Sequence, residues 1–318
     1  MITGFTAVRN TLKGGYPFVE SILSALPACD KFIVSEGYST DGTYDVLKRL
    51  ADSHPKIELH RNGWVVNKHN VKGGRVLSDA ANEARKQCLG RGTHLLYVQA
   101  NEVIHEESVD KIKRLPEEHP HATLFHLPFY HIIGKDLVFS EEYRIRLVAN
   151  LPSIMAVGDA GFMCFSKSST IRQMLKAAAN PRNAADRVLG IISPYGLDRG
   201  QFTHIMLPKP VFRYASLYRG SYIEKLNERM KLVGETDKAD LTSFVEKLNS
   251  EMSDRQFKKL LYERIKLSVT GSRTFSNPHF LYEPHELQMS QQPKIMQGLL
   301  KSKATRYFVR KGLLKPSD

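Results

Sequence analysis

The chain has 318 residues, of which 42% are hydrophobic and 25% charged, with a net charge of +13. This length exceeds a typical single domain, so we expect one large domain with an extension, or two domains. The three cysteines, Cys29, Cys88 and Cys164, form no CxxC pair and are too few for a disulfide scaffold, which favours a reducing compartment. No apolar run approaches the about 20 residues that cross a bilayer, and no signal-peptide pattern is present, so we expect a soluble cytoplasmic protein.

Over the first 130 residues, short apolar runs alternate with helical patterns, which is typical of a mostly parallel sheet with crossover helices. The expected strands are 2–8, 31–35, 57–60, 94–99, 123–129, 144–148 and 163–165, and the expected helices are 18–26, 44–51, 74–88 and 106–115. Pro116 should close the last of these helices. Residues 172–200 mix helical patterns with glycine and proline breaks.

From residue 218 onward, apolar positions recur three and four apart and predict helices at 223–233, 241–252 and 257–267. We therefore expect an α/β sheet domain over 1–215 and a helical extension over 216–318. Residues 294–315 carry seven basic side chains and no acidic one, interleaved with apolar residues. Such a tail either lies on an anionic membrane surface or partner, or forms a terminal helix that packs on the protein with solvated lysines.

Polar and glycine residues follow the second expected strand, in the segment SEGYSTDGT (35–43). Glu36 and Asp41 supply carboxylates, Gly37 and Gly42 let the backbone bend, and Asp41 or Thr43 can cap the following helix. Open α/β sheets bind ligands beside the carboxyl ends of their strands, so this turn is a candidate half of a nucleotide site. An ordinary βα loop with a capped helix explains the segment alone equally well.

Two further segments carry chemistry at the ends of expected elements. In VKGGRVL (71–77), glycines expose backbone amides just before a helix, and Lys72 and Arg75 are cationic, so the loop is a candidate diphosphate cradle. In LLYVQANEVIHE (95–106), Asn101 and Glu102 follow an apolar strand. Because the carboxyl ends of parallel strands lie at the same edge of a sheet, Asn101 and Glu102 should lie at the same edge as Glu36. Two polar strand ends at one edge make a cleft.

These segments together resemble the nucleotide-sugar-dependent glycosyltransferases of family 2, which have the GT-A fold, a Rossmann-like sheet flanked by helices. The motifs that carry the resemblance are GFTAVRN, VSEGYSTDGT, KGGRVLSDAANEA and YVQANEVIHE, in that order. Their combination is similar to that of a bacterial and archaeal branch of the family. The resemblance covers roughly residues 1–165, fades through residue 235 and is absent beyond it.

The resemblance implies a donor site for a UDP-, GDP- or dTDP-sugar. Glu36 and Asp41 would bind or support the nucleoside, with Arg9 and Asn10 beneath it. The residues that would face the diphosphate are Lys72, Gly74 and Arg75.

The chain departs from the family at the D-x-D motif that ligates Mg or Mn. Gln99 and Asn101 stand at its two acidic places, and an amide gives a cation only a neutral oxygen, although Glu102 can compensate. In VFRYASL (211–217), Arg213 stands where relatives often carry a histidine. Arg213 cannot ligate a cation but can neutralise the leaving diphosphate, so our hypothesis is that charge stabilisation has moved from a metal to a guanidinium group. The alternative is that Arg213 is a surface residue and that this segment does not correspond to the one that carries the histidine in the relatives.

Inverting transfer needs a general base for the acceptor hydroxyl. Asp159 in AVGDAGFM stands where the resembling proteins have an acidic residue, and Glu141 and Glu142 are alternatives; Asp159 can equally cap a turn. Arg144 and Arg146 alternate on an expected strand, so they share a face and can reach substrate phosphate or pair with Glu141 and Glu142.

The sequence therefore predicts an inverting glycosyltransferase of cell-surface polysaccharide biosynthesis that moves a sugar to a glycan or lipid-linked acceptor, in the cytoplasm or at the inner membrane face. The alternative is a catalytically weak or inactive nucleotide-sugar-binding protein of the same fold, because Gln99 and Asn101 replace carboxylates. The basic charge alone would also suit nucleic acid, but no reading motif or base-stacking pattern accompanies it.

Overall fold

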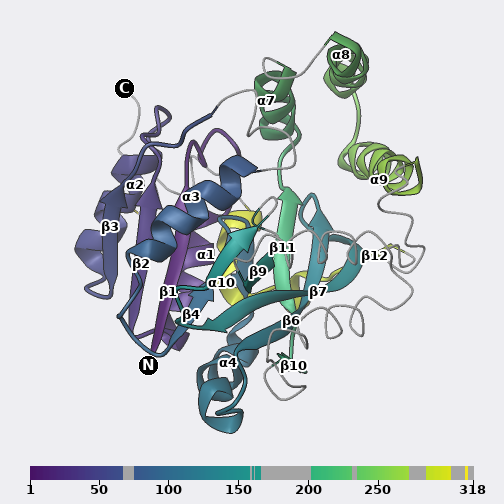
Figure 1. Ribbon diagram of the computed structural model, residues 1–318. Helices are drawn as coiled ribbons and strands as arrows, with labels where there is room; N and C mark the ends of the chain where they lie inside the picture. The colour runs from purple at the N-terminus through teal and green to yellow at the C-terminus, as the bar shows by residue number, and fades with distance from the viewer. Residues whose placement is uncertain are drawn as a thin grey trace.

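The computed structural model describes residues 1–66, 75–157, 160, 162–165, 202–230, 235–271, 284–301 and 312–313. Its main sheet has the strand order β3-β2-β1-β4-β7-β6-β11-β5, with β10 added beside β6 and β12 beside β7 (Figure 1). The strands of this sheet are β1 (Ile2–Val8), β2 (Lys31–Glu36), β3 (Ile57–Arg61), β4 (His94–Tyr97), β5 (Glu102–Ile104), β6 (Leu124–Ile133), β7 (Leu137–Ala149), β10 (Phe202–His204), β11 (Val211–Ser216) and β12 (His285–Glu286). A separate antiparallel hairpin joins β8 (Ile154–Val157) and β9 (Phe162–Phe165).

The described α-helices are α1 (Phe18–Ala25), α2 (Thr43–Ser53), α3 (Arg75–Lys86), α4 (Glu106–Glu118), α7 (Arg219–Met230), α8 (Glu235–Asn249), α9 (Asp254–Gly271) and α10 (Lys294–Leu300). The α/β architecture and the C-terminal helices predicted from the sequence are confirmed. The division at residue 215 stays a prediction.

The direction of strand pairing changes from parallel to mixed across the sheet. β1 pairs in parallel with β2 and β4, and β2 with β3, so the carboxyl ends of these strands meet at one edge. β7 then runs antiparallel to both β4 and β6. β11 is parallel to β6 but antiparallel to the short β5. The parallel half is an open α/β sheet, and the mixed half brings strands from distant parts of the chain beside it.

Alternation along the strands builds two hydrophobic layers, because successive side chains point to opposite faces. Phe5 and Ile33 pack with Ala81 and Ala84 of α3 and with the β8–β9 hairpin. Phe32 and neighbouring residues of the other face pack with α1, α2, α4 and α10. Cys29 and Cys88 are free and buried within these layers, and burial raises the pKa of each thiol to about 12, so neither is a reactive thiolate.

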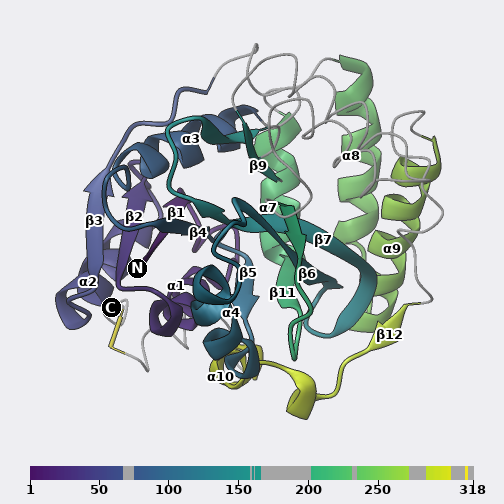
Figure 2. The ribbon, with the colours of Figure 1, turned by 60° about the horizontal axis from the view of Figure 1, so that its bottom comes forward.

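The helical extension packs on the mixed half of the sheet, where Figure 2 shows α8 and α9 beside β6 and β7. Ile133 and Phe139, at the turn between β6 and β7, lie in one cluster with Leu226, Leu248 and Leu261 of α7, α8 and α9. No helix among the described residues is long and apolar enough to cross a membrane.

The C-terminal segment then returns to the sheet domain. β12 pairs with β7, and α10 lies by α1 with its apolar side chains in the same core cluster as Phe18. Met296, Leu299 and Leu300 are buried, whereas the side chain of Lys294 is exposed. Over residues 294–300, the tail is therefore a helix that packs on the protein with a solvated lysine.

Several expected boundaries differ from those observed. Helix α4 continues through Pro116 to Glu118. A proline in the last turn removes only one backbone hydrogen bond close to the end of the helix, so the helix tolerates it there. β4 ends at Tyr97, and the residues after its polar turn form β5, which the sequence did not predict. β6 and β7 are longer than expected. The expectation for residues 172–200 lies outside the described residues.

Candidate functional site

Glu36, the last residue of β2, organises the turn that follows it. Its side chain is fully buried, and its two oxygens accept hydrogen bonds from the Ser39 N–H (2.5 Å) and from Arg61 Nε (2.9 Å). Tyr38 in this turn has a positive φ of 54° and is 53% exposed. The Arg61 guanidinium lies 4.4 Å from the ring of Tyr38 and 4.1 Å from that of Tyr44. The carboxylate thus holds the turn, and an exposed aromatic ring stands at its tip.

Asn10 and Asp41 tie this turn to the loop after β1. The Asn10 N–H donates to Ser39 Oγ (2.9 Å), and the Thr40 N–H donates to Asn10 Oδ1 (2.9 Å). Asp41 Oδ2 accepts from the Lys13 N–H (2.8 Å), while Oδ1 accepts from an N–H in the first turn of α2 (3.0 Å). The structure therefore brings Asn10, Glu36 and Asp41 together, and each uses its side chain to shape the turn.

Gly37 allows a third segment to close on the turn. A Cβ built at this glycine would lie 2.7 Å from Trp64 Nε1 and 3.0 Å from Cβ of Arg9. Trp64 Nε1 and Arg9 Nε are buried and have no hydrogen-bond partner among the described residues. Two buried donors beside a strand end require acceptors, which a bound ligand can supply.

The predicted diphosphate loop falls mainly outside the described residues, which is true of Lys72 and Gly74. Arg75 is exposed and is the first described residue of α3. The predicted general base Asp159 is also outside the described residues.

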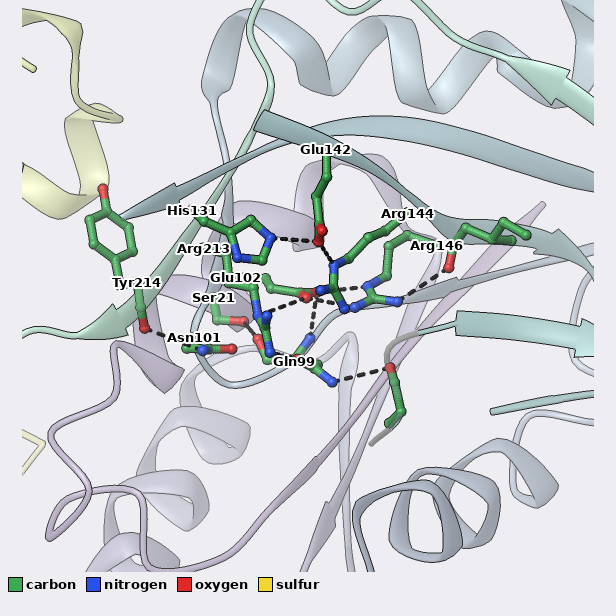
Figure 3. A network of polar contacts seen from close by, with 12 residues as sticks. Ser21, Gln99, Asn101, Glu102, His131, Glu142, Arg144, Arg146, Arg213 and Tyr214 are labelled. Atoms are coloured by element: carbon green, nitrogen blue, oxygen red, sulfur yellow. Dashed lines mark hydrogen bonds and ion pairs between the residues drawn. The ribbon is translucent and has the colours of Figure 1, made fainter. Parts of the chain in front are cut away.

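A second group of polar side chains crosses the mixed half of the sheet, and we call it the polar row (Figure 3). Its members come from β5, β6, β7 and β11 and comprise Glu102, His131, Glu142, Arg144, Arg146 and Arg213. Strand register sets Arg213 opposite both Glu102 and His131. Residues 142, 144 and 146 alternate along β7 and so share one face, as the sequence predicts for the two arginines.

Glu102 and Arg146 form a buried ion pair in the polar row. Arg146 Nε and Nη2 donate to the two oxygens of Glu102 at 2.9 and 2.7 Å, and the side chains are only 2% and 1% exposed. Burial raises the pKa of Glu102, but the guanidinium of Arg146 outweighs it, so the pKa lies below the ordinary value of 4.5. The Arg146 guanidinium also lies 5.1 Å from the Tyr97 ring and 5.5 Å from the Phe129 ring. Glu102 is therefore ionised and already neutralised.

Arg213 joins the polar row to the end of β4. Its Nη2 donates to Gln99 Oε1 (3.2 Å), and its Nε lies 3.8 Å from Glu102 Oε1. Gln99 Nε2 donates in turn to the carbonyl oxygen of Ala160 (3.1 Å). Arg213 therefore lies beside Gln99 and Glu102, with its side chain 20% exposed, and its role stays a prediction.

Asn101 is held by two hydrogen bonds to Tyr214 of β11. Its Nδ2 donates to the carbonyl oxygen of Tyr214 (3.2 Å), and the Tyr214 N–H donates to the carbonyl oxygen of Asn101 (2.9 Å). The Tyr214 hydroxyl lies 2.5 Å from Gln292 Oε1, between β12 and α10. The C-terminal segment therefore supports β11, which contains Arg213 and is hydrogen-bonded to Asn101.

These contacts do not fit the Mg or Mn site that the resemblance implies. Both oxygens of Glu102 accept from Arg146, and Gln99 Oε1 accepts from Arg213. A divalent cation prefers several oxygen ligands with negative charge, whereas this position is bordered by guanidinium groups. No group of three potential metal ligands (His, Cys, Asp or Glu) occurs among the described residues. The side chains of Gln99 and Glu102 are thus engaged by arginines and do not form a metal site.

Glu142 lies between His131 and Arg144. His131 Nε2 is 2.6 Å from Glu142 Oε1, and Arg144 Nε contacts the same oxygen. Burial raises the pKa of Glu142, but Arg144 and His131 outweigh it, so the pKa lies well below 4.5. Burial lowers the pKa of His131 below 6.5, against the opposing effect of Glu142, so the imidazole is neutral near pH 7. Glu142 is consequently a poor general base.

Sequence reasoning missed three features of this region. It did not find the partner of Glu102 and did not assign His131 or Trp64 to a site. The spacing of Arg144 and Arg146 on one strand face was the available signal for the ion pair. Which carboxylate each arginine meets depends on strand pairing, and Arg146 forms its buried ion pair with Glu102.

No protein-family model and no curated protein matches the chain. Among solved structures, S. aureus TarS is 14% identical with a TM-score of 0.39, over 98% of this chain and 54% of that one, so this chain spans about half the length of TarS. TarS residues 1–349 in complex with UDP match with 14% identity and a TM-score of 0.39, over 100% and 93% of the two chains.

The mannosyltransferase PcManGT from Pyrobaculum calidifontis, in complex with GDP-Man and Mn2+, is 14% identical with a TM-score of 0.38, over 84% of this chain and 69% of that one. Such low similarity does not assign an activity to this chain.

Proposed function

We propose that this protein is an inverting glycosyltransferase that uses a nucleotide-sugar donor. The observation that carries the proposal is the pair of loops at the carboxyl ends of β1 and β2. There, Asn10, Glu36 and Asp41 fix two loops against each other, and buried donors of Arg9 and Trp64 lack partners among the described residues. This edge is where open α/β sheets bind nucleotides.

The nucleoside would rest on the turn between β2 and α2. The Tyr38 ring offers a flat apolar surface there, and its left-handed backbone conformation is uncommon for a residue with a side chain. Residues held in such conformations cluster at functional sites, because surrounding contacts must stabilise them. Asn10, Glu36 and Asp41 act on the nucleoside through the shape of this turn.

The sugar and diphosphate would extend from this turn toward the end of β4 and the polar row, with Arg75 at the start of α3 and Lys72 and Gly74 before it. Asp159 remains our choice for the base that takes the proton from the acceptor hydroxyl. The acceptor would be a glycan or a lipid-linked glycan, reached from the cytoplasm or the inner membrane face.

A second candidate is a nucleotide-sugar-binding protein without turnover. The observation that favours it is that Glu102 is neutralised by Arg146 and that Gln99 and Asn101 supply no carboxylate. The two candidates share the nucleoside turn and differ in whether the bond between sugar and diphosphate is cleaved.

The test is thermal unfolding with UDP, GDP and dTDP, followed by incubation with the corresponding sugars. We expect one nucleotide to raise the melting temperature, by mass action on the folded state, and the matching sugar donor to be hydrolysed slowly. Stabilisation without hydrolysis or transfer would favour the second candidate. No response to any nucleotide would contradict both.

A matched pair of variants tests whether the nucleotide that stabilises the protein binds at this turn. Asp41→Asn keeps the size of the side chain but loses one of two accepted hydrogen bonds, so nucleotide stabilisation should fall. Asp45→Asn makes the same chemical change at an exposed position two residues into α2 and should leave nucleotide stabilisation unchanged. Equal loss in both variants would count against the turn as the nucleoside site.

A further inference from the structure

Tyr38, at the tip of the turn after β2, is an exposed aromatic residue in a strained backbone conformation. It is 53% exposed, and its φ of 54° is one that a residue with a side chain seldom adopts. Glycine or asparagine would adopt this conformation at a lower cost, so the fold alone does not require an aromatic side chain here. A large ring that is strained and exposed to solvent therefore points to a role in binding.

Arg61 lies over two tyrosine rings beside this turn. Its guanidinium carbon is 4.4 Å from the centre of the Tyr38 ring and 4.1 Å from that of the Tyr44 ring in α2. Its Nε also donates to the buried carboxylate of Glu36, its neighbour in the pairing of β2 with β3 (2.9 Å). A cation over an aromatic ring is attracted to the negative face of that ring. The ring of Tyr38 is therefore held by contacts that lead back to the end of β2.

The chain after β3 runs beside the same ring. The Asn62 N–H donates to the carbonyl oxygen of Glu36 (2.9 Å), and its Nδ2 donates to Ser35 Oγ (3.0 Å). A Cβ built at Gly63 would lie 4.0 Å from two atoms of the Tyr38 ring, so this segment borders the ring but leaves half of the residue exposed. The ring thus stands ready at the carboxyl ends of β2 and β3, where open α/β sheets bind nucleotides.

We propose that the nucleobase of the donor stacks on the ring of Tyr38, and that Arg61 is a positioning residue that holds this ring. The inference rests on the proposed function and assigns recognition of the base to one side chain. Every base has a flat π face, and stacking on an aromatic ring strengthens binding by about five- to 150-fold. Because the ring is already held in place, less conformational entropy is lost when the nucleotide binds.

The carboxylate of Glu36 then serves binding without touching the nucleotide. One of its oxygens accepts from the Ser39 N–H (2.5 Å) and the other from Arg61 Nε (2.9 Å), so both are used within the protein. The first contact fixes the backbone directly after Tyr38, and the second fixes the guanidinium group over its ring. The base is recognised by its face, on a ring that this carboxylate holds from below.

Calorimetric titration with the nucleoside diphosphate that gives the largest thermal stabilisation tests this inference on two variants. Tyr38→Asn removes the ring but suits the left-handed backbone, so the melting temperature without ligand should not fall, whereas nucleotide binding should weaken at least about fivefold. Tyr38→Phe keeps the ring and should bind within about twofold of the wild type. Unchanged binding by Tyr38→Asn would overturn the inference and leave the proposed function intact. No binding of any nucleoside diphosphate to the wild type would overturn both.

A double-variant cycle tests whether Arg61 acts through Tyr38. Arg61→Gln should weaken nucleotide binding in the wild type but should weaken it no further in Tyr38→Asn, because an absent ring cannot be positioned. Arg255→Gln removes the same charge from an exposed position on α9 and should change binding in neither background. If Arg61→Gln weakened binding by the same factor in both backgrounds, Arg61 would act independently of the ring, and its positioning role would be refuted.

Discussion

Replacing Arg146 by methionine would show how much the buried pair with Glu102 matters to the fold. The Arg146 side chain is 2% exposed and gives Glu102 two hydrogen bonds, at 2.9 and 2.7 Å. Methionine fills much of the same space but leaves the carboxylate of Glu102 buried without this partner. Removing one member of a buried pair costs about 3 to 5 kcal/mol, because the remaining charge stays desolvated. We expect Arg146→Met to lower the free energy of unfolding by this amount.

The double variant Glu102→Gln with Arg146→Met separates lost charge from lost packing. With both charges gone, no carboxylate is left uncompensated, so the double variant should regain a large part of the stability lost in Arg146→Met. The free energy of unfolding would be measured by urea denaturation, followed by circular dichroism and by the fluorescence of Trp64, the single tryptophan.

Lys86→Met is the control, because the ion pair between Lys86 and Glu83 is on the surface and should contribute little to the free energy of unfolding. Two results would refute the reasoning. One is an Arg146→Met protein within about 1 kcal/mol of the wild type, far below the cost of stranding a buried charge. The other is a double variant no more stable than the single one.

Three further predictions concern other parts of the site. Gly37→Ala places a Cβ 2.7 Å from Trp64 Nε1, so the tryptophan emission should shift and nucleotide binding should weaken; an unchanged spectrum and dissociation constant would count against this packing. Gln292→Leu removes the acceptor 2.5 Å from the buried Tyr214 hydroxyl and should lower the free energy of unfolding in urea by about 1 to 3 kcal/mol, whereas an unchanged value would show that the contact is dispensable. The folded-state pKa of His131 lies below 6.5, so the unfolded chain takes up its proton first and stability should fall as the pH drops below 6.5. His131→Gln should reduce this loss in urea midpoints measured from pH 8 to 5, and an unaltered slope would contradict it.

Local patterns predicted the strand, the turn and the helix of residues 31–50 well. Residues 31–50 carry a strand, a glycine-bearing turn and a helix in immediate succession, and each of these signals depends only on neighbours in the chain. The structure has β2 and α2 there, with Asp41 accepting from an N–H at the start of α2. Asn10 could be placed against the turn because β1 and β2 are adjacent parallel strands.

The polar row could not be predicted, because it depends on which distant strands become neighbours. Glu102 and Arg146 are 44 residues apart, and the insertion of β11 between β6 and β5 brings Arg213 beside them. Periodicity shows that Arg144 and Arg146 share a face but does not show what faces them. The position of α10 is similar: the composition of the tail left a membrane surface and the protein core open, and Met296 lies in the core.

Backbone amide NMR during titration with the nucleoside diphosphate tests the central claim most directly, because it shows where the nucleotide binds. The account predicts shifts concentrated at residues 9–12 and 36–43 and at the Trp64 indole N–H, with resonances of α8 and α9 unmoved. Shifts confined to the helical extension, or no shifts at millimolar nucleotide, would contradict the claim that the turn after β2 holds the nucleoside of a sugar donor.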